Sequence, residues 1–330
     1  MKVKEDVEKR DYYFDNIKAI MIFLVVLGHF IEIGMYKNEL FQGIWYAIYL
    51  FHMPLFIFVA GYFTKESQEN AKKAIKNYLI PYIIFSIALY IFRIFILKQK
   101  VNIQFLSPQY GMWFLIIIFS YKVIYNGICK LRGIFIISII LAIIVGLDKS
   151  FTNLWAFSRT IVFLPFFIAG SKFKKEYLIK EKKYIKIILG ILILVILIGV
   201  GFFCTKLNIP MNLLRSSTPY SSLKIQVEKA MLMRGVMLLL GFIVSYMILN
   251  IIPNKKIPIS YIGQNTMITY ILHIFIIQYC MEYNILDGNT YKTFFISIIA
   301  TILIVLITSL PILKKGYDKI LKGITKLLNI

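Results

Sequence analysis

Residues 14–30, FDNIKAIMIFLVVLGHF, form an apolar run with a basic residue near its start and a histidine near its end. Lys18 and His29 are eleven residues apart, so at about 100° per residue they share one face of a helix, roughly 16 Å apart along its axis. The other two histidines of the chain, His52 and His273, also lie in apolar runs. Because an ionisable group costs roughly 2.5 kcal/mol or more at the centre of a membrane helix, three such rings predict a polar chamber. The alternative is that each ring only hydrogen-bonds a neighbouring helix.

The composition is that of an integral membrane protein. Of 330 residues, 59% are hydrophobic and 16% charged, and the mean hydropathy is +0.75. At roughly 17 to 25 residues per span, the apolar runs predict an all-α, polytopic membrane bundle of about ten transmembrane helices in a single domain, residues 1–330. The predicted spans are residues 16–36, 41–63, 78–97, 111–128, 133–147, 159–171, 185–204, 230–252, 265–281 and 293–313, of which the fifth and sixth are short.

The net charge of +22 follows the loops between these spans. Alternate loops and the two ends hold 25 of the 38 Lys and Arg residues, and the intervening loops hold nine. This imbalance predicts that both termini are cytoplasmic, and it explains the basic residues without a nucleic-acid partner. Residues 1–15 are then a cytoplasmic lead to a first helix that is retained, residues 205–229 an extracytoplasmic loop, and residues 314–330 a cytoplasmic tail. The loop either covers an outward opening or is a plain connector.

The first helix also carries two carboxylates. Glu32 lies one turn beyond His29, and Asp15 lies close to the same face near the cytoplasmic edge. A carboxylate that orients an imidazole is the usual arrangement of a general base, so His29, Glu32 and Asp15 are the candidate catalytic residues. In the alternative interpretation Lys18 and Glu32 extend to opposite membrane surfaces and only His29 remains to be explained.

Other polar residues are predicted to line the chamber. His52 and His273 lie near the middle of their spans, and residues 262–273, IGQNTMITYILH, place Asn265, Tyr270 and His273 on about one face of a helix. Arg159 precedes a short segment that contains Pro165, where a substrate can approach, although a membrane-surface anchor is an equally good interpretation. The three cysteines are isolated, and no metal-binding motif or glycine-rich nucleotide loop is present, so we expect no metal and no permanently bound cofactor.

Five segments in this order resemble the acyltransferase 3 family of integral membrane acyltransferases, particularly its short members described as fucose 4-O-acetylase-like. They are FDNIKAIMIFLVVLGHF, FHMPLFIFVAGYF at 51–63, MWFL at 112–115 with Trp113, RTIVFLPFFIAG at 159–170, and IGQNTMITYILH. The family's basic-to-histidine motif falls on Lys18 and His29, which makes His29 the candidate catalytic residue by resemblance too. The basic position holds Lys rather than Arg, which gives up bidentate phosphate recognition. The appended hydrolase-like domain of some longer relatives is not expected.

The resemblance implies transfer of an acyl group, usually acetyl from cytoplasmic acetyl-CoA, to a hydroxyl of a cell-surface carbohydrate or its lipid-linked precursor at the cell membrane. Lys18, with Lys72, Lys73 and Lys76, is expected to lie near the donor's phosphates. His29 would either deprotonate the acceptor hydroxyl or take the acetyl group itself. His52, Asn265, Tyr270 and His273 would shape the chamber.

Two other classes share some of these features. A transporter or flippase of a glycan precursor or small polar solute also needs ionisable residues at the membrane midplane and an outward loop, but the sequence shows no inverted repeat. A catalytically silent scaffold in a glycan-assembly complex is the third class. Consumption of a thioester distinguishes the enzyme from both.

Overall fold

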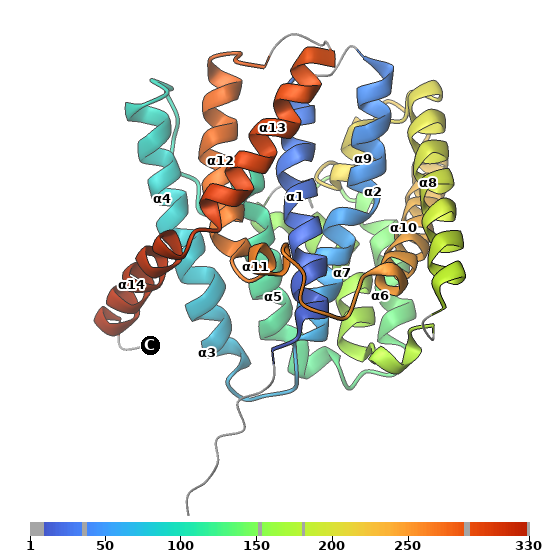
Figure 1. The fold of residues 1–330 in the computed structure, drawn as a ribbon, viewed down its shortest axis with the longest axis horizontal. Helices are drawn as coiled ribbons and strands as arrows, with labels where there is room; N and C mark the ends of the chain where they lie inside the picture. The colour runs from blue at the N-terminus through green and yellow to red at the C-terminus, as the bar shows by residue number, and fades with distance from the viewer. Residues whose placement is uncertain (1–9, 35–37, 151–153, 180–181, 287–290, 329–330) are drawn as a thin grey trace, which may run out of the picture.

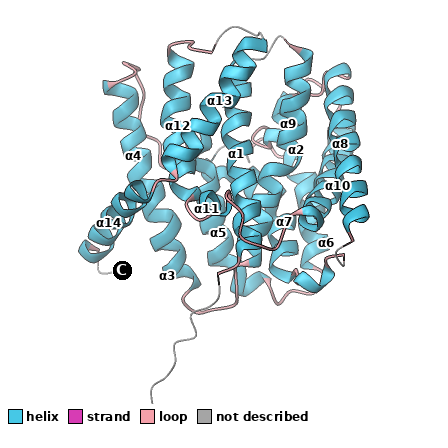
Figure 2. Cartoon of the chain, in the orientation of Figure 1, coloured by secondary structure: helices cyan, strands magenta, loops and turns pink. Residues whose placement is uncertain are grey.

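A computed structural model describes residues 10–34, 38–150, 154–179, 182–286 and 291–328, and all of its regular structure is helical (Figures 1 and 2). Eight helical segments are long and apolar enough to cross a membrane. They are α1 (Tyr12–Gly34), α2 (Glu39–Tyr62), the continuous α3, η1 and α4 (Asn70–Ala74, Ile75–Leu79, Ile80–Phe95), η2 with α5 (Tyr110–Met112, Trp113–Ile128), η4 with α7 (Leu154–Ala156, Phe157–Lys172), α8 (Lys183–Lys206), α10 (Val227–Ile251) and α13 (Tyr291–Thr308).

Two shorter apolar segments complete the set. They are α6 with its last turn η3 (Ile134–Ile144, Val145–Leu147) and α12 (Thr266–Glu282). Within the described residues these ten segments match the ten predicted spans, so the predicted all-α bundle is confirmed and the chain is an integral membrane protein. The remaining helical pieces are η5 (Lys175–Tyr177), α9 (Met211–Arg215), η6 (Tyr220–Ser222), α11 (Ser260–Gly263) and α14 (Pro311–Leu327).

The last predicted span ends earlier than its apolar run. We predicted a helix over residues 293–313, but α13 ends at Thr308 and a new helix, α14, begins at Pro311. Proline has no backbone N–H and disfavours helical backbone in the residue before it, and Leu310 is accordingly extended (φ −60°, ψ 140°). The chain therefore turns, and α14 carries five lysines along the lower edge of the bundle rather than extending α13 (Figure 1).

Helix α2 lies at the centre of the bundle and packs against α1, α7, α8 and α10. Its crossing with α7 is a direct backbone contact, because a Cβ on Gly61 would collide with the carbonyl of Phe167 and one on Gly170 with that of Phe58. Small residues at helix crossings are how membrane helices approach closely. The crossing fixes the position of α7 relative to α2, the helix that carries His52.

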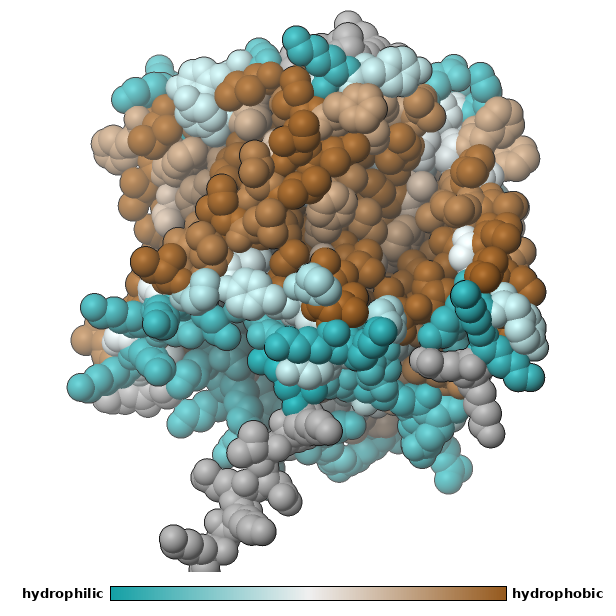
Figure 3. Space-filling view, viewed as in Figure 1, coloured by the Kyte–Doolittle hydropathy of each residue, from teal (hydrophilic) through white to brown (hydrophobic). Residues whose placement is uncertain are grey.

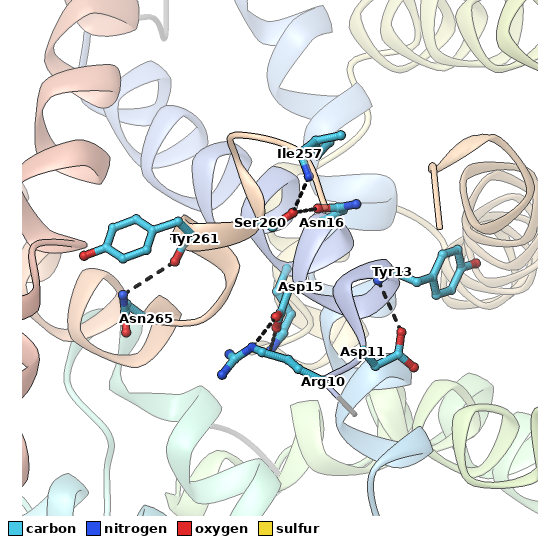
Figure 4. Close-up of polar contacts among 10 residues, drawn as sticks. Arg10, Asp11, Tyr13, Asp15, Asn16, Ile257, Ser260, Tyr261 and Asn265 are labelled. Atoms are coloured by element: carbon cyan, nitrogen blue, oxygen red, sulfur yellow. Dashed lines mark hydrogen bonds and ion pairs between the residues drawn. The ribbon is translucent and has the colours of Figure 1, made fainter. Parts of the chain in front are cut away.

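The start of α1 is tied to the linker between α10 and α12 (Figure 4). The side-chain amide of Asn16 donates to the carbonyls of Pro253 and Lys255, and Ser260 Oγ donates to Asn16 Oδ1 at 2.6 Å. Gly263 on α11 meets the backbone of Asp15 directly. These contacts fix the level of α12 relative to α1, and with it the level of His273 relative to His29.

The surface separates into an apolar band and polar edges (Figure 3). Leu194, Ile198 and Phe202 on α8 follow one another at helical spacing, and each is more than half exposed. Exposed apolar stripes of this kind face lipid in a membrane protein. Hydrophilic residues gather at the lower edge of this face, where α1 begins and α3 and α14 lie, and we call this edge the basic end of the bundle.

Candidate active site

A cavity of about 190 Å³ lies between α1, α2, α5, α7, α9 and α12. We call it the histidine chamber. Its polar lining comes from six helices and one short turn, and the rest of the wall is apolar, including Val25, Met53 and Phe163. The polar lining residues are His29, Glu32, Tyr49, His52, Tyr110, Trp113, Arg159, Arg215 and Tyr270.

The imidazole of His29 is held at its Nδ1 atom. Glu32 Oε2 lies 3.5 Å from this nitrogen, Tyr49 Oη 3.4 Å and Tyr110 Oη 3.2 Å. Tyr49 donates its hydroxyl proton to Glu32 Oε2 at 2.6 Å. The Tyr49 hydroxyl oxygen and the Glu32 carboxylate can therefore both accept a hydrogen bond from Nδ1 of His29. This arrangement favours the Nδ1–H tautomer and leaves a lone pair on Nε2.

His29 is stacked on a second histidine. The ring centroids of His29 and His273 are 5.4 Å apart, with 24° between the planes. His273 is fully buried, and its Nδ1 lies 3.0 Å from the carbonyl of Thr269. A carbonyl only accepts, so Nδ1 of His273 carries the proton. Its Nε2 has no hydrogen-bond partner among the residues that the structure describes.

The third histidine is fixed in the same way. His52 Nδ1 lies 2.7 Å from the carbonyl of Ile48, and its ring meets that of Tyr49 edge to face. The Nδ1–H tautomer again follows, so His52 also presents Nε2 as an acceptor. His29 and His52 thus line the chamber, whereas His273, predicted to line it as well, does not and stacks on the ring of His29 instead.

Glu32 connects His29 to the segment between α8 and α10. Arg215, at the end of α9, donates to Glu32 Oε1 at 2.5 Å, and its guanidinium lies over the Trp45 ring at 5.5 Å. Since Leu214 and Arg215 both line the chamber, the predicted extracytoplasmic loop supplies part of the chamber wall. Three polar residues of the chamber were not predicted from the sequence: Tyr49, Tyr110 and Arg215. The only signals available were that Tyr49 lies three residues before His52 and that Arg215 lies in the predicted loop.

Trp113 and Arg159, both predicted chamber residues, contact each other. The guanidinium of Arg159 lies over the Trp113 ring at 4.8 Å, and its Nε donates to the backbone carbonyl of Arg215 at 2.9 Å. Tyr270 forms the floor and donates its hydroxyl proton to the carbonyl of Gly111. Trp113, Arg159 and Tyr270 therefore all line the chamber.

Asp15 and Asn265 do not line the chamber, and Figure 4 shows the polar contacts that they make instead. Asp15 forms ion pairs with Arg10 at 2.8 Å and with Lys18 at 2.9 Å. It precedes His29 by fourteen residues, about 21 Å along a helix, so Glu32 is the carboxylate in a position to orient the imidazole and Asp15 is not. Asn265 donates to the carbonyls of Ser309 and Tyr261, and so joins α12 to the end of α13.

A second cavity, of about 210 Å³, lies nearer the basic end. We call it the inner cavity. Lys18, Tyr78, Lys122 and Thr266 contribute its polar atoms, and Tyr270 lines both this cavity and the histidine chamber. Lys122 was not predicted; its Nζ donates to Thr64 Oγ1 at 2.9 Å.

The other predicted donor-binding lysines lie on the surface. Lys72 and Lys73 on α3 and Lys76 on η1 are exposed and do not line the inner cavity. Lys73 pairs with Glu69 at 2.7 Å. These three side chains can contribute to the positive potential of the basic end, but they do not form a pocket with Lys18.

Comparison with known families decides which class of protein this geometry belongs to. A family model described as an acyltransferase domain, Acyl_transf_3, matches residues 11–313. The chain belongs to the acyltransferase 3 family. All of the chamber residues fall within the matched range, and the family resemblance recognised in the sequence is confirmed.

Similarity to individual curated relatives covers a much shorter segment. The chain is 47% identical over 58 residues to "Nodulation protein NolL" of Sinorhizobium fredii (strain NBRC 101917 / NGR234), which is 16% of this chain and 15% of the relative. It is 40% identical over 58 residues to the protein of the same name from Mesorhizobium japonicum (strain LMG 29417 / CECT 9101 / MAFF 303099), with the same coverage. The matched segment thus spans about 15% of these relatives. No solved structure matches the chain.

Proposed function

We propose that this protein is a membrane O-acetyltransferase, which moves an acetyl group from cytoplasmic acetyl-CoA to a hydroxyl of a cell-surface carbohydrate or its lipid-linked precursor. The observation that carries the proposal is the contact of His29 with Glu32 inside a membrane-embedded chamber, in a chain of the acyltransferase 3 family. A positioned imidazole with a free Nε2 is the group that acyl transfer requires.

Two routes fit this geometry. In the first, Nε2 of His29 takes the proton of the acceptor hydroxyl as its oxygen attacks the thioester carbonyl, the carbon–sulfur bond breaks, and the imidazolium returns the proton to the CoA sulfur. In the second, Nε2 attacks the thioester first, the carbon–sulfur bond breaks and CoA is released as its thiolate. The acceptor oxygen then attacks the acetyl carbon, the carbon–nitrogen bond to the histidine breaks, and the acceptor's proton passes to the CoA sulfur.

The network around Nδ1 serves both routes. As Nε2 takes a proton or an acetyl group, the ring becomes positively charged. Glu32, 3.5 Å from Nδ1, stabilises that charge without moving, because Arg215 and Tyr49 already hold its carboxylate. Groups that are oriented before the reaction need no reorganisation during it, which is the main source of electrostatic catalysis.

The donor would approach from the basic end, through the inner cavity. Lys18 and Lys122 are the cations there, and Tyr270 separates them from the histidine chamber. Lysine binds phosphate as a point charge, so these two side chains would hold the nucleotide phosphates while the thioester reaches His29. Lys72, Lys73 and Lys76 would attract the donor at longer range.

The test is consumption of radiolabelled acetyl-CoA by the detergent-purified protein, with release or transfer of the label followed over time. We expect the wild type to consume the thioester and His29→Ala to lose this activity while its thermal stability is kept. Tyr184→Ala, which removes an exposed ring remote from the chamber, is the matched control. A well-folded wild type that neither binds nor consumes acetyl-CoA would contradict the proposal and favour a transporter.

A further inference from the structure

The charges of the histidine chamber do not balance within the protein. Two arginines and one carboxylate line it: Arg159, Arg215 and Glu32. The carboxylate pairs with Arg215 and accepts from Tyr49. In the part of the chain that the structure describes, Arg159 has no carboxylate within ion-pair distance, so the chamber holds one cation more than it can neutralise.

The guanidinium of Arg159 is also fixed in direction. Its Nε donates to the carbonyl of Arg215 at 2.9 Å, and its plane lies over the Trp113 ring at 4.8 Å. No described residue accepts a hydrogen bond from either terminal nitrogen. The fork formed by these two nitrogens is therefore held in place at the chamber wall but is not used by the protein.

A cation at membrane depth that has no acidic partner among the described residues points to an anionic ligand. Ionisable residues inside membranes almost always pair with another group or mark a substrate site. The planar fork of arginine matches the two oxygens of a carboxylate or a phosphate, which it binds through two parallel hydrogen bonds. A neutral sugar hydroxyl does not require this charge.

The position of Arg159 favours a group on the acceptor over the reacting carbonyl. Arg159 touches Arg215, Arg215 pairs with Glu32, and Glu32 lies beside His29. Arg159 is thus three contacts away from the imidazole along this network. It lies next to α9, whose Leu214 and Arg215 line the chamber but not the inner cavity. A group bound there would lie beside the reacting atoms and on the acceptor's side.

We propose that Arg159 is the core of an anion subsite and that the acceptor is an anionic carbohydrate, with a carboxylate or phosphate held by Arg159 near the hydroxyl that is acetylated. This inference rests on the proposed function for its acceptor. The subsite itself rests only on the charges and contacts of Arg159, so the two can fail separately.

The experiment measures binding of three small probes to the full chain in detergent, by calorimetry at fixed ionic strength. The probes are methyl glucoside, methyl glucuronide and methyl glucoside 6-phosphate, which differ in charge at one position. We expect at least one anionic probe to bind the wild type about tenfold or more tightly than the neutral probe. Preference for the glucuronide identifies a sugar carboxylate, and preference for the phosphate identifies a phosphorylated precursor.

The variants decide whether Arg159 is responsible. Arg159→Gln removes the charge and should abolish the preference, whereas Arg159→Lys keeps the charge without the fork and should keep part of it. Arg93→Gln is the matched control, since the Arg93 side chain at the end of α4 donates to Gln99 and Gln109 and does not line the chamber. This variant should keep the full preference. Equal binding of all probes by the wild type, or a preference that survives in Arg159→Gln, overturns the subsite.

Acetyl-CoA consumption, measured on the same wild-type sample, separates this inference from the proposed function. Anion preference without thioester consumption refutes the acetyltransferase and keeps the subsite. Thioester consumption without anion preference supports the acetyltransferase and refutes the subsite. If Arg159→Gln lowers transfer to charged and neutral acceptors equally and leaves their relative binding unchanged, Arg159 acts on the reacting carbonyl and the subsite is wrong.

Discussion

The histidine chamber and the inner cavity are of similar size, about 190 and 210 Å³, and share Tyr270, but their charged groups are held differently. In the chamber, Glu32 connects His29, Tyr49 and Arg215 in one network drawn from three helices. In the inner cavity, Lys18 pairs with Asp15 one turn away on α1, and Lys122 on α5 donates to Thr64, which follows α2. Glu32 is thus held by partners from other helices, whereas each lysine of the inner cavity has a single hydrogen-bond or ion-pair partner among the described residues.

The strongest test of this contrast removes the imidazole of the chamber. His29→Ala should lower acetyl transfer by about 10³-fold, because general-base and nucleophilic roles are commonly worth 10²–10⁴. Initial rates at saturating acetyl-CoA, with thermal stability as the folding control, provide the measurement. A folded variant that keeps more than about a tenth of the rate would mean that the chamber is not where the chemistry occurs.

A smaller loss is expected when the imidazole stays and its carboxylate loses its charge. Glu32→Gln should lower the rate on the order of 10²-fold with little change in KM for acetyl-CoA, because the ring loses the charge that stabilises its cationic form. Asp15→Asn is the matched control, since Asp15 pairs with Arg10 and Lys18 and not with His29. Equal losses in the two variants would remove the distinction between the two carboxylates.

The crossing of α2 and α7, which both line the chamber, should be sensitive to added side-chain volume. Gly61→Ala places a Cβ against the carbonyl of Phe167 where α2 crosses α7, and overpacking of this kind costs about 1–3 kcal/mol of stability. A lower midpoint of thermal unfolding in detergent is the expected result. Gly127→Ala, which meets nothing within 4 Å, should leave the midpoint unchanged, and a similar drop there would point to a general intolerance of substitution.

The smallest effects are expected at the inner cavity. Lys18→Gln or Lys122→Gln should raise KM for acetyl-CoA about fivefold, the equivalent of about 1 kcal/mol for one partly exposed charge, with kcat nearly unchanged. Replacing Lys72, Lys73 and Lys76 together by Gln should change KM by less than about twofold at 0.15 M salt, because exposed charges are screened. A larger increase in KM in this triple variant would mean that the donor's phosphates bind outside the inner cavity.

Much of the fold could be predicted from the sequence because it follows from local properties. Length and hydropathy of a run decide whether it spans a bilayer, and all ten runs became helices. The third begins at Asn70, eight residues before its predicted start, because α3 and η1 precede α4. The early end of α13 at Thr308 has a local cause in Pro311. The stacking of His29 on His273 could not be predicted in this way, because it depends on the contacts of Asn16 that fix the level of α12 relative to α1.

The composition of the site was predicted only in part. His29 and Glu32 lie one turn apart on one helix, so helical geometry alone placed them together. Arg215 and Tyr110 reach the same space from α9 and η2, and Lys122 reaches the inner cavity from α5. No spacing along the chain reveals such contacts. Helical periodicity reports direction around an axis and not distance along it. It therefore placed Asp15 on the same face as His29, although the two are about 21 Å apart along the helix.

The amino-acid sequence by itself determined a membrane bundle of about ten helices, the pairing of His29 with a carboxylate one turn away, and membership of an acyltransferase family. Each depends on neighbours within a helix or on a pattern along the chain. Only the tertiary structure decided that Arg215 holds Glu32, that Tyr270 separates two cavities, and that Arg159 has no acidic partner among the described residues. These facts depend on which helices pack together, and backbone contacts such as that of Gly61 with Phe167 set that packing.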